Sequence, residues 1–155
     1  MAFHIRALDP APFAPLFQMS DSELEAQLAR RETATHSPGF PCRVSLQDAT
    51  VGEEVLLVHY EHQDAATPFR ASHAIYVRRG AEQAEPEPDT VPEFLRVRTL
   101  SVRAFSGEGM ILSAKVVAGE ELAAELRTML SADEVSYLHL HSAAMGCYLA
   151  RAERV

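Results

Sequence analysis

The sequence of 155 residues has few cysteines and no long apolar stretch. Its two cysteines, Cys42 and Cys147, stand far apart in the chain, so they cannot form the disulfide framework of a small secreted domain. A single bridge between them stays open, but a reducing cytosol would oppose it. No run of about 18 apolar residues occurs, and we therefore expect no membrane-spanning segment. The N-terminus lacks the apolar core of a signal peptide, which favours a cytoplasmic protein.

Positive charge is also scarce in this chain. It has 14 lysines and arginines against 22 acidic residues, and its formal net charge is -8 at pH 7. Binding to nucleic acid requires positive charge that displaces phosphate counterions, so we expect no nucleic-acid partner. The chain carries no Ser-His-Asp signature and no glycine-rich phosphate loop, so the sequence leaves open whether the protein is an enzyme.

The composition is that of a globular protein, with 47% hydrophobic and 23% charged residues. We expect a single domain over residues 1–155. The apolar patterns predict an α+β fold, with one antiparallel or mixed sheet of six to eight strands and two helices, at about 20–31 and 119–131. Ser20 is a favourable N-cap for the first helix, and Glu23 completes a capping box.

Two segments in the middle of the chain have distinct patterns. Residues 81–93 contain three prolines and five acidic residues and almost nothing apolar. Such a segment cannot bury surface, and we expect a mobile acidic, proline-rich loop. From Phe94 to Phe105 the apolar residues alternate in two phases, which predicts a long strand with a bend between Val97 and Leu100.

A pair of histidines near the C-terminus is the main candidate for chemistry. His139 and His141 alternate with leucines, so both imidazoles should project from one face of a strand. If a hairpin follows, with a loop over residues 142–146, His141 lies opposite Cys147 and His139 opposite Leu149. Two nitrogens and one sulfur would then begin a site for zinc or another divalent metal. Alternatively, the histidines lie on a partly solvated face without a metal.

The same residues could support nucleophilic catalysis. A cysteine reacts as its thiolate, which a nearby imidazole stabilises, so Cys147 with His141 is a candidate pair. Cys42 is a second candidate nucleophile. Either cysteine could equally be a small buried hydrophobic residue.

A third interpretation is ligand binding without catalysis. Arg70 and His62 belong to segments that bracket a polar loop, and together they could hold a small anion such as a carboxylate or phosphate. Arg70 could instead pair with a nearby carboxylate. The candidate ligand-binding residues are Cys42, Arg43, Glu61, His62 and Arg70.

Our leading hypothesis is a polar site that gathers Cys42, His62, His139, His141 and Cys147. A homodimeric or larger interaction module without catalysis is the remaining alternative.

Several segments also carry a family resemblance. They are Phe40-Pro41-Cys42-Arg43-Val44-Ser45-Leu46, Gly52-Glu53-Glu54-Val55-Leu56-Leu57, Tyr60-Glu61-His62, Pro68-Phe69-Arg70-Ala71-Ser72, His139-Leu140-His141 and Gly146-Cys147-Tyr148. Together they resemble a bacterial family of uncharacterised proteins, the domain of unknown function numbered 1203. The resemblance spans nearly the whole chain and implies a small stand-alone bacterial protein, without an assigned activity. The family's loop before the glycine-cysteine pair tends to carry Asn, Arg and Pro, whereas this chain has Ser142-Ala143-Ala144-Met145.

Overall fold

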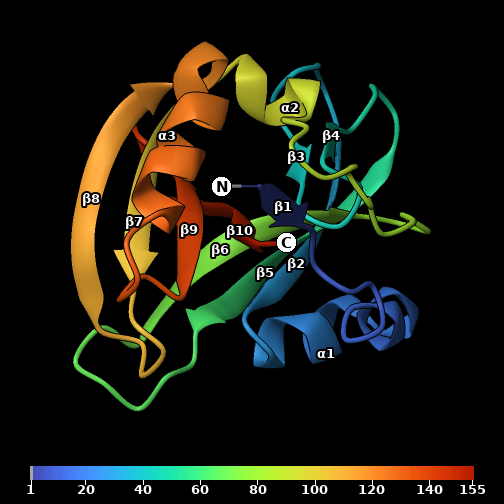
Figure 1. The fold of residues 1–155 in the computed structure, drawn as a ribbon. Coiled ribbons are helices and arrows are strands. Elements are labelled where there is room, and N and C mark those ends of the chain that lie inside the picture. Colours follow the sequence, from blue (N-terminus) through green and yellow to red (C-terminus); the bar gives the residue numbers. More distant parts are fainter. Residues whose placement is uncertain (1) are drawn as a thin grey trace. The chain divides into compact units, whose positions relative to one another are not determined.

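The computed structural model describes residues 2–155 and has an α+β fold, with three α-helices and two sheets of five strands each (Figure 1). The strands are β1 (Phe3–Arg6), β2 (Ala29–Thr33), β3 (Pro41–Cys42), β4 (Gln47–Asp48), β5 (Glu54–Gln63), β6 (Ala71–Arg78), β7 (Thr99–Phe105), β8 (Ile111–Ala118), β9 (Tyr137–Ser142) and β10 (Tyr148–Arg154). The helices are α1 (Asp21–Ala26), α2 (Glu93–Arg96) and α3 (Leu122–Leu130), with 3-10 turns η1 (Ala14–Gln18) and η2 (Gly119–Glu121).

The chain forms two compact units, which are described separately. The first comprises residues up to 6, residues 61–71 and residues 85–155. The second comprises residues 7–60 and 72–84. The end of β5 and the loop that follows it therefore belong to the first unit.

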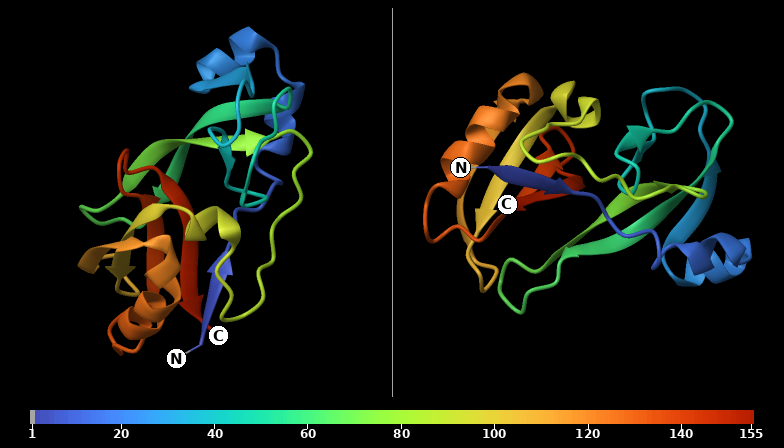
Figure 2. Two further views of the ribbon diagram at one scale, coloured as in Figure 1. Left: turned by 90° about the horizontal axis from the view of Figure 1, so that it is seen from above. Right: turned by 45° about the vertical axis from the view of Figure 1, so that its right-hand side comes forward.

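The first unit contains a sheet in the order β1-β10-β9-β7-β8, and all its neighbouring strands are antiparallel. The N-terminal strand β1 lies beside the C-terminal strand β10 (Figure 2). Paired residues on adjacent strands share a face, so Val102, Leu140 and Lys115 point the same way. Lys115 Nζ lies 3.0 Å from a carboxylate oxygen of Glu125 in α3, which places α3 over this face. Val102 and Leu140 are fully buried there.

The opposite face of this sheet is lined by polar and aromatic side chains. Three neighbouring strands contribute to it, and pairing across them keeps these residues on one side. They are Ser101, Arg103, Phe105, Tyr137, His139, His141, Tyr148 and Arg151. The face of the sheet under α3 thus forms the core of the first unit. The opposite face holds the polar and aromatic side chains.

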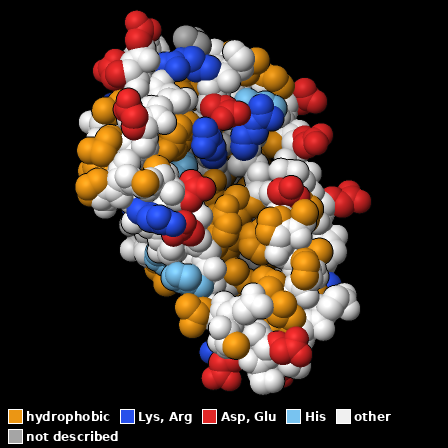
Figure 3. Space-filling view, turned by 90° about the horizontal axis from the view of Figure 1, so that it is seen from below, with side chains coloured by type: hydrophobic (Ala, Val, Ile, Leu, Met, Phe, Trp, Pro, Cys, Tyr) orange, Lys and Arg blue, Asp and Glu red, His pale blue; other side chains and the backbone are white. Residues whose placement is uncertain are grey.

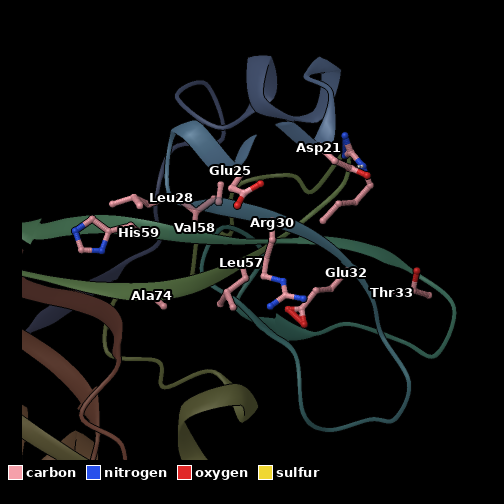
Figure 4. Close-up of a pocket in the computed structure, with 12 residues that line it drawn as sticks. Asp21, Glu25, Leu28, Arg30, Glu32, Thr33, Leu57, Val58, His59 and Ala74 are labelled. Atoms are coloured by element: carbon pink, nitrogen blue, oxygen red, sulfur yellow. Dashed lines mark ion pairs between the residues drawn. The ribbon is translucent and has the colours of Figure 1, made fainter. Parts of the chain in front are cut away.

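The second unit is built on the sheet β2-β5-β6-β3-β4 and on α1. Its core is apolar and includes Phe13, Leu24, Leu56 and Ile75. Beside β2 and α1 lies an open pocket of about 890 Å³ (Figure 4). Both acidic and basic side chains line this pocket, so its charge favours neither an anion nor a cation.

The first predicted helix begins as expected but ends early. The hydroxyl of Ser20 accepts a hydrogen bond of 3.2 Å from the backbone N–H of Glu23, which confirms the N-cap. The helix was expected to reach residue 31, but Leu28 adopts a left-handed conformation with φ of 55°. Residues 29–33 then pair with β5 as an edge strand. The second predicted helix, at 119–131, is confirmed as η2 followed by α3.

The expectation of one sheet with six to eight strands is wrong, because ten strands form two sheets. One strand that was not expected is β2, at residues 29–33. Its charged sequence lacks the apolar alternation by which a strand is predicted. The expected long strand from Phe94 to Phe105 is also wrong at its start. Residues 93–96 form the short helix α2, so the change of phase marks a helix followed by a strand. A third α-helix therefore joins the two that were expected.

The segment 81–93 has no helix or strand before α2 begins at Glu93. Within the first unit, Asp89 lies 3.3 Å from the guanidinium of Arg127. Whether this segment is mobile and whether the chain is a single domain stay predictions.

Acidic and basic side chains are interspersed on the face shown in Figure 3. Within residues 2–155, every helix falls short of the length and apolar character needed to traverse a bilayer.

Candidate metal centre

Three histidines meet in the first unit. His62 comes from the end of β5, and His139 and His141 come from β9. One nitrogen from each ring can be chosen so that all three lie within 4.8 Å of one another. The ring centroid of His62 lies 4.9 Å from that of His141 and 6.0 Å from that of His139. Side chains of histidine at this separation can converge on one metal ion.

The alternation along β9 explains the placement of its two histidines. Leu138 and Leu140 are fully buried on the face under α3, so the residues between them project from the other face. His139 and His141 are nevertheless only 3% and 1% exposed. The prediction that both imidazoles share one face is confirmed, and other side chains cover them.

Hydrogen bonds hold the loop after His62 against the sheet. The side-chain amide of Gln63 donates to the hydroxyl of Tyr137 at 2.8 Å. The hydroxyl of Thr67 donates to the carbonyl of Gly109 at 3.1 Å. Gln63 is 3% exposed, so its bond is shielded from water. These contacts fix the end of β5 and therefore the position of His62.

Aromatic rings surround the three imidazoles. The ring of Tyr148 stacks on that of His62, with centroids 5.4 Å apart and an angle of 7° between planes. It meets His139 and His141 edge-on, at 5.2 Å and 5.6 Å. Phe105 packs against His139 from another direction, with centroids 5.0 Å apart. This packing restricts rotation of the imidazoles and pre-organises the cluster.

The environment keeps His139 in its neutral form. Burial lowers the pKa of His139 from 6.5 to about 3, and the nearby His141 and His62 lower it further. Its Nδ1 is buried, and no group in residues 2–155 forms a hydrogen bond with it. Metal ions bind the neutral imidazole, so this side chain offers a lone pair at neutral pH without competition from protons.

The backbone of the β9–β10 turn selects the tautomer of His141. Its Nδ1 lies 2.8 Å from the carbonyl oxygen of Gly146. A carbonyl only accepts hydrogen bonds, so Nδ1 carries the proton and Nε2 keeps its lone pair. This Nε2 atom is buried inside the cluster. A carbonyl that orients a histidine in this way is typical of metal ligands.

Two arginines stand on either side of His139 in the sheet, Arg103 on β7 and Arg151 on β10. Arg151 pairs with Glu153 at 3.2 Å, and its guanidinium lies 4.0 Å from the ring centroid of Tyr137. Burial lowers the pKa of Arg103. Neither arginine was among the residues predicted from the sequence, although their positions in alternating strands beside β9 were the signal that could have identified them.

The predicted register of the C-terminal hairpin is wrong. His141 lies opposite Tyr148, and His139 lies opposite Arg151, with an irregularity between Tyr148 and residue 150. The turn is shorter than expected, because the N–H of Ser142 donates to the carbonyl of Cys147 at 2.8 Å. A glycine with φ of 78° at position 146 makes this tight turn accessible. Cys147 is thus partly exposed in the turn, and the set of converging donors consists of histidines.

Cys42 and Arg43 belong to the second unit, whereas the three histidines belong to the first. Cys42 is fully buried, and its Sγ accepts hydrogen bonds from the backbone N–H groups of Ser45 and Arg78 at 3.4 Å and 3.3 Å. Arg43 is 3% exposed and donates to the carbonyl of Pro41 at 2.6 Å. Both residues therefore have structural contacts within their own unit.

Glu61 and Arg70 form an ion pair in the first unit. Arg70 Nε and Nη2 each lie 3.0 Å from an oxygen of the Glu61 carboxylate, which makes a two-pronged contact. This contact is the alternative expected from the sequence, in which Arg70 pairs with a nearby carboxylate and not with a bound anion. Of the five residues in the leading hypothesis, the structure brings together His62, His139 and His141.

Comparison with known proteins supplies a family but no activity. No curated protein and no solved structure matches the chain. A family model described as "Protein of unknown function (DUF1203)" matches residues 39–154. This range covers most of the sequence and includes all three histidines of the cluster. The chain therefore belongs to the DUF1203 family.

Proposed function

We propose that this protein binds one divalent transition-metal ion, zinc in the first place, through His62, His139 and His141. The observation that carries the proposal is the convergence of one nitrogen from each ring within 4.8 Å. Zinc binds histidine nitrogen at about 2.0–2.1 Å in tetrahedral geometry, which corresponds to about 3.3 Å between donors. The donor nitrogens therefore need to approach one another by up to about 1.5 Å on metal binding, a shift that small side-chain rotations supply.

The donor chemistry supports zinc over harder ions. Three imidazoles suit zinc, copper, iron and nickel, whereas magnesium and calcium prefer oxygen ligands. Structural zinc sites have four protein ligands, and catalytic sites have three and leave a position for water or substrate. Three histidines match the second arrangement, so the bound ion would retain an open coordination position.

The groups around the histidines support the same proposal. The carbonyl of Gly146 directs the Nε2 lone pair of His141 into the cluster. The bond between Gln63 and Tyr137 holds the strand end that carries His62. Second contacts of this kind typically contribute 10–100-fold to metal affinity.

Competitive titration tests the proposal. The protein, without a histidine tag, is stripped of metal and titrated with zinc against a chromophoric chelator. We expect one zinc ion per chain, and a loss of roughly 10–100-fold or more in affinity for His62→Gln, His139→Gln and His141→Gln. His59→Gln is the matched control, because His59 is an exposed residue on the same strand as His62.

Circular dichroism confirms that each variant is folded before its affinity is interpreted. Wild-type protein that fails to compete with the chelator would contradict the proposal. So would variants of the three clustered histidines that bind zinc as tightly as His59→Gln. His62 is less buried than the other two, which makes His62→Gln the variant that perturbs folding least.

A further inference from the structure

Arg103 is a half-buried cation beside the histidine cluster. Its Nε donates to the hydroxyl of Ser101 at 3.2 Å. Within residues 2–155, no acidic side chain forms an ion pair with Arg103. A partly buried charge without a counter-charge is costly, and an anionic ligand beside it would offset that cost.

Arg103 also lies on the same face of the sheet as the proposed metal ligands His139 and His141. It lies opposite His139 in the pairing of β7 with β9. Its Nη2 is 3.9 Å from the position that a Cβ would take on Gly146, the residue whose carbonyl orients His141. The guanidinium therefore lies on the histidine face of the sheet, beside the turn that positions one of the three donors.

The other nearby cations are already neutralised. Arg151 pairs with Glu153, and the single lysine of the chain, Lys115, pairs with Glu125 on the opposite face of the sheet. Arg70, elsewhere in the first unit, pairs with the carboxylate of Glu61. Among these cations of residues 2–155, Arg103 is the one beside the histidines without an acidic partner.

We infer that the open position of this centre binds a small carboxylate, with one oxygen on the metal ion and the other accepting hydrogen bonds from Arg103. The inference rests on the proposed metal binding. A guanidinium donates charge-assisted N–H hydrogen bonds, which a carboxylate oxygen that is not bound to the metal can accept. A phosphate carries more charge and more oxygens than one arginine and one open metal position satisfy. The site is therefore matched to a carboxylic acid substrate or effector.

Cobalt(II) reports on this ligand, because its visible absorption changes when the ligands around the ion change. The metal-free protein is loaded with cobalt and titrated separately with acetate and with phosphate. We expect acetate to shift the spectrum in a saturable way. Arg103→Gln should weaken acetate binding roughly tenfold while leaving cobalt affinity within about a factor of two, because the arginine contacts the anion and not the metal. Arg103→Lys keeps the positive charge but loses the planar set of N–H donors, so its acetate affinity should lie between those of the wild type and Arg103→Gln.

Arg70→Gln is the control, because Arg70 is an exposed arginine of the same unit that already has a partner. It should bind acetate like the wild type. A cobalt spectrum that acetate does not change overturns the carboxylate inference and leaves the metal proposal standing. Equal losses in Arg103→Gln and Arg70→Gln, or tighter Arg103-dependent binding of phosphate than of acetate, also overturn it. Failure of wild-type protein to bind cobalt overturns both proposals, and a spectrum that shows only the weak absorption of aqueous cobalt identifies that outcome.

Discussion

The amide of Gln63 donates a hydrogen bond of 2.8 Å to the hydroxyl of Tyr137, across 74 positions of sequence. Gln63 follows His62 directly, and Tyr137 stands two residues before His139 on the same strand face. The bond therefore joins the two chain segments that supply the three imidazoles. Its geometry governs how closely His62 approaches the histidines of β9.

Tyr137→Phe should weaken both folding and zinc binding. The substitution leaves the buried Gln63 amide without its acceptor, which should lower the free energy of unfolding by about 1–3 kcal/mol. Zinc affinity should fall as well, because the segment that carries His62 is held less firmly. Urea denaturation and the chelator titration measure the two effects.

Tyr76→Phe is the control for this variant. Tyr76 lies in the second unit, and its hydroxyl makes a long contact of 3.4 Å with Glu32. We expect it to leave zinc affinity unchanged. A Tyr137→Phe protein with wild-type zinc affinity would show that the bond does not position His62.

Gly109→Ala should destabilise the protein, and Gly107→Ala should not. Gly109 has φ of 89°, and a Cβ at this position would collide with the Cβ of Ala65. The left-handed conformation alone costs a non-glycine residue about 1–2 kcal/mol. Gly107 lies in the same turn with open space around it. Its replacement should change the free energy of unfolding by no more than about 0.5 kcal/mol. Equal stability of the two variants in urea would contradict the packing of the loop after β5, at Ala65, against the turn before β8, at Gly109.

The stability of the metal-free protein should fall as the pH drops below 6.5. The pKa of His139 is 6.5 in its ordinary state and about 3 in the fold. The unfolded chain therefore takes up a proton that the folded protein does not, and the loss is about 1.4 kcal/mol per pH unit for one proton. This contribution is present in full above pH 6.5 and declines down to about pH 3.

His139→Gln should remove this slope between pH 6.5 and 4.5. The pKa of Glu53 is lowered from 4.5 to about 2 by hydrogen bonds from Thr50 and by Arg78, so its own contribution is lost only below pH 4.5. The interval above that value therefore reports on His139 without Glu53. Urea denaturation in the presence of a chelator measures the slope, and identical slopes in wild type and variant would contradict the assignment.

Cys147→Ser should leave zinc affinity within about a factor of three of the wild type, since no cysteine belongs to the converging donor set. The same titration with the chromophoric chelator measures it. A loss of affinity comparable to that of His141→Gln would mean that the thiolate reaches the ion, and would restore the donor set expected from the sequence.

Local patterns in the sequence were enough to predict part of the site. The alternation of leucine and histidine placed His139 and His141 on one face, because side-chain direction in a strand depends only on position. The Ser20 cap and the helix after residue 119 likewise follow from neighbouring residues. Features of this kind need no knowledge of distant contacts.

The remaining features depend on contacts that are remote in sequence or on single backbone angles. His62 was only one of several candidate ligands, because its place is fixed by the bond from Gln63 to Tyr137. The hairpin register depends on the left-handed conformation of Gly146, and one residue of difference exchanged Cys147 for Tyr148 opposite His141. Hydrophobic patterns carry no information about such angles.

X-ray absorption at the zinc edge of the zinc-loaded protein tests the three-histidine centre most directly. We expect three nitrogen scatterers at about 2.0–2.1 Å with the outer-shell signal of imidazole, and a fourth light atom from water or carboxylate. We expect no sulfur in this shell, because the proposed donors are His62, His139 and His141. A sulfur scatterer at about 2.3 Å, or a shell without imidazole, would contradict the proposed centre.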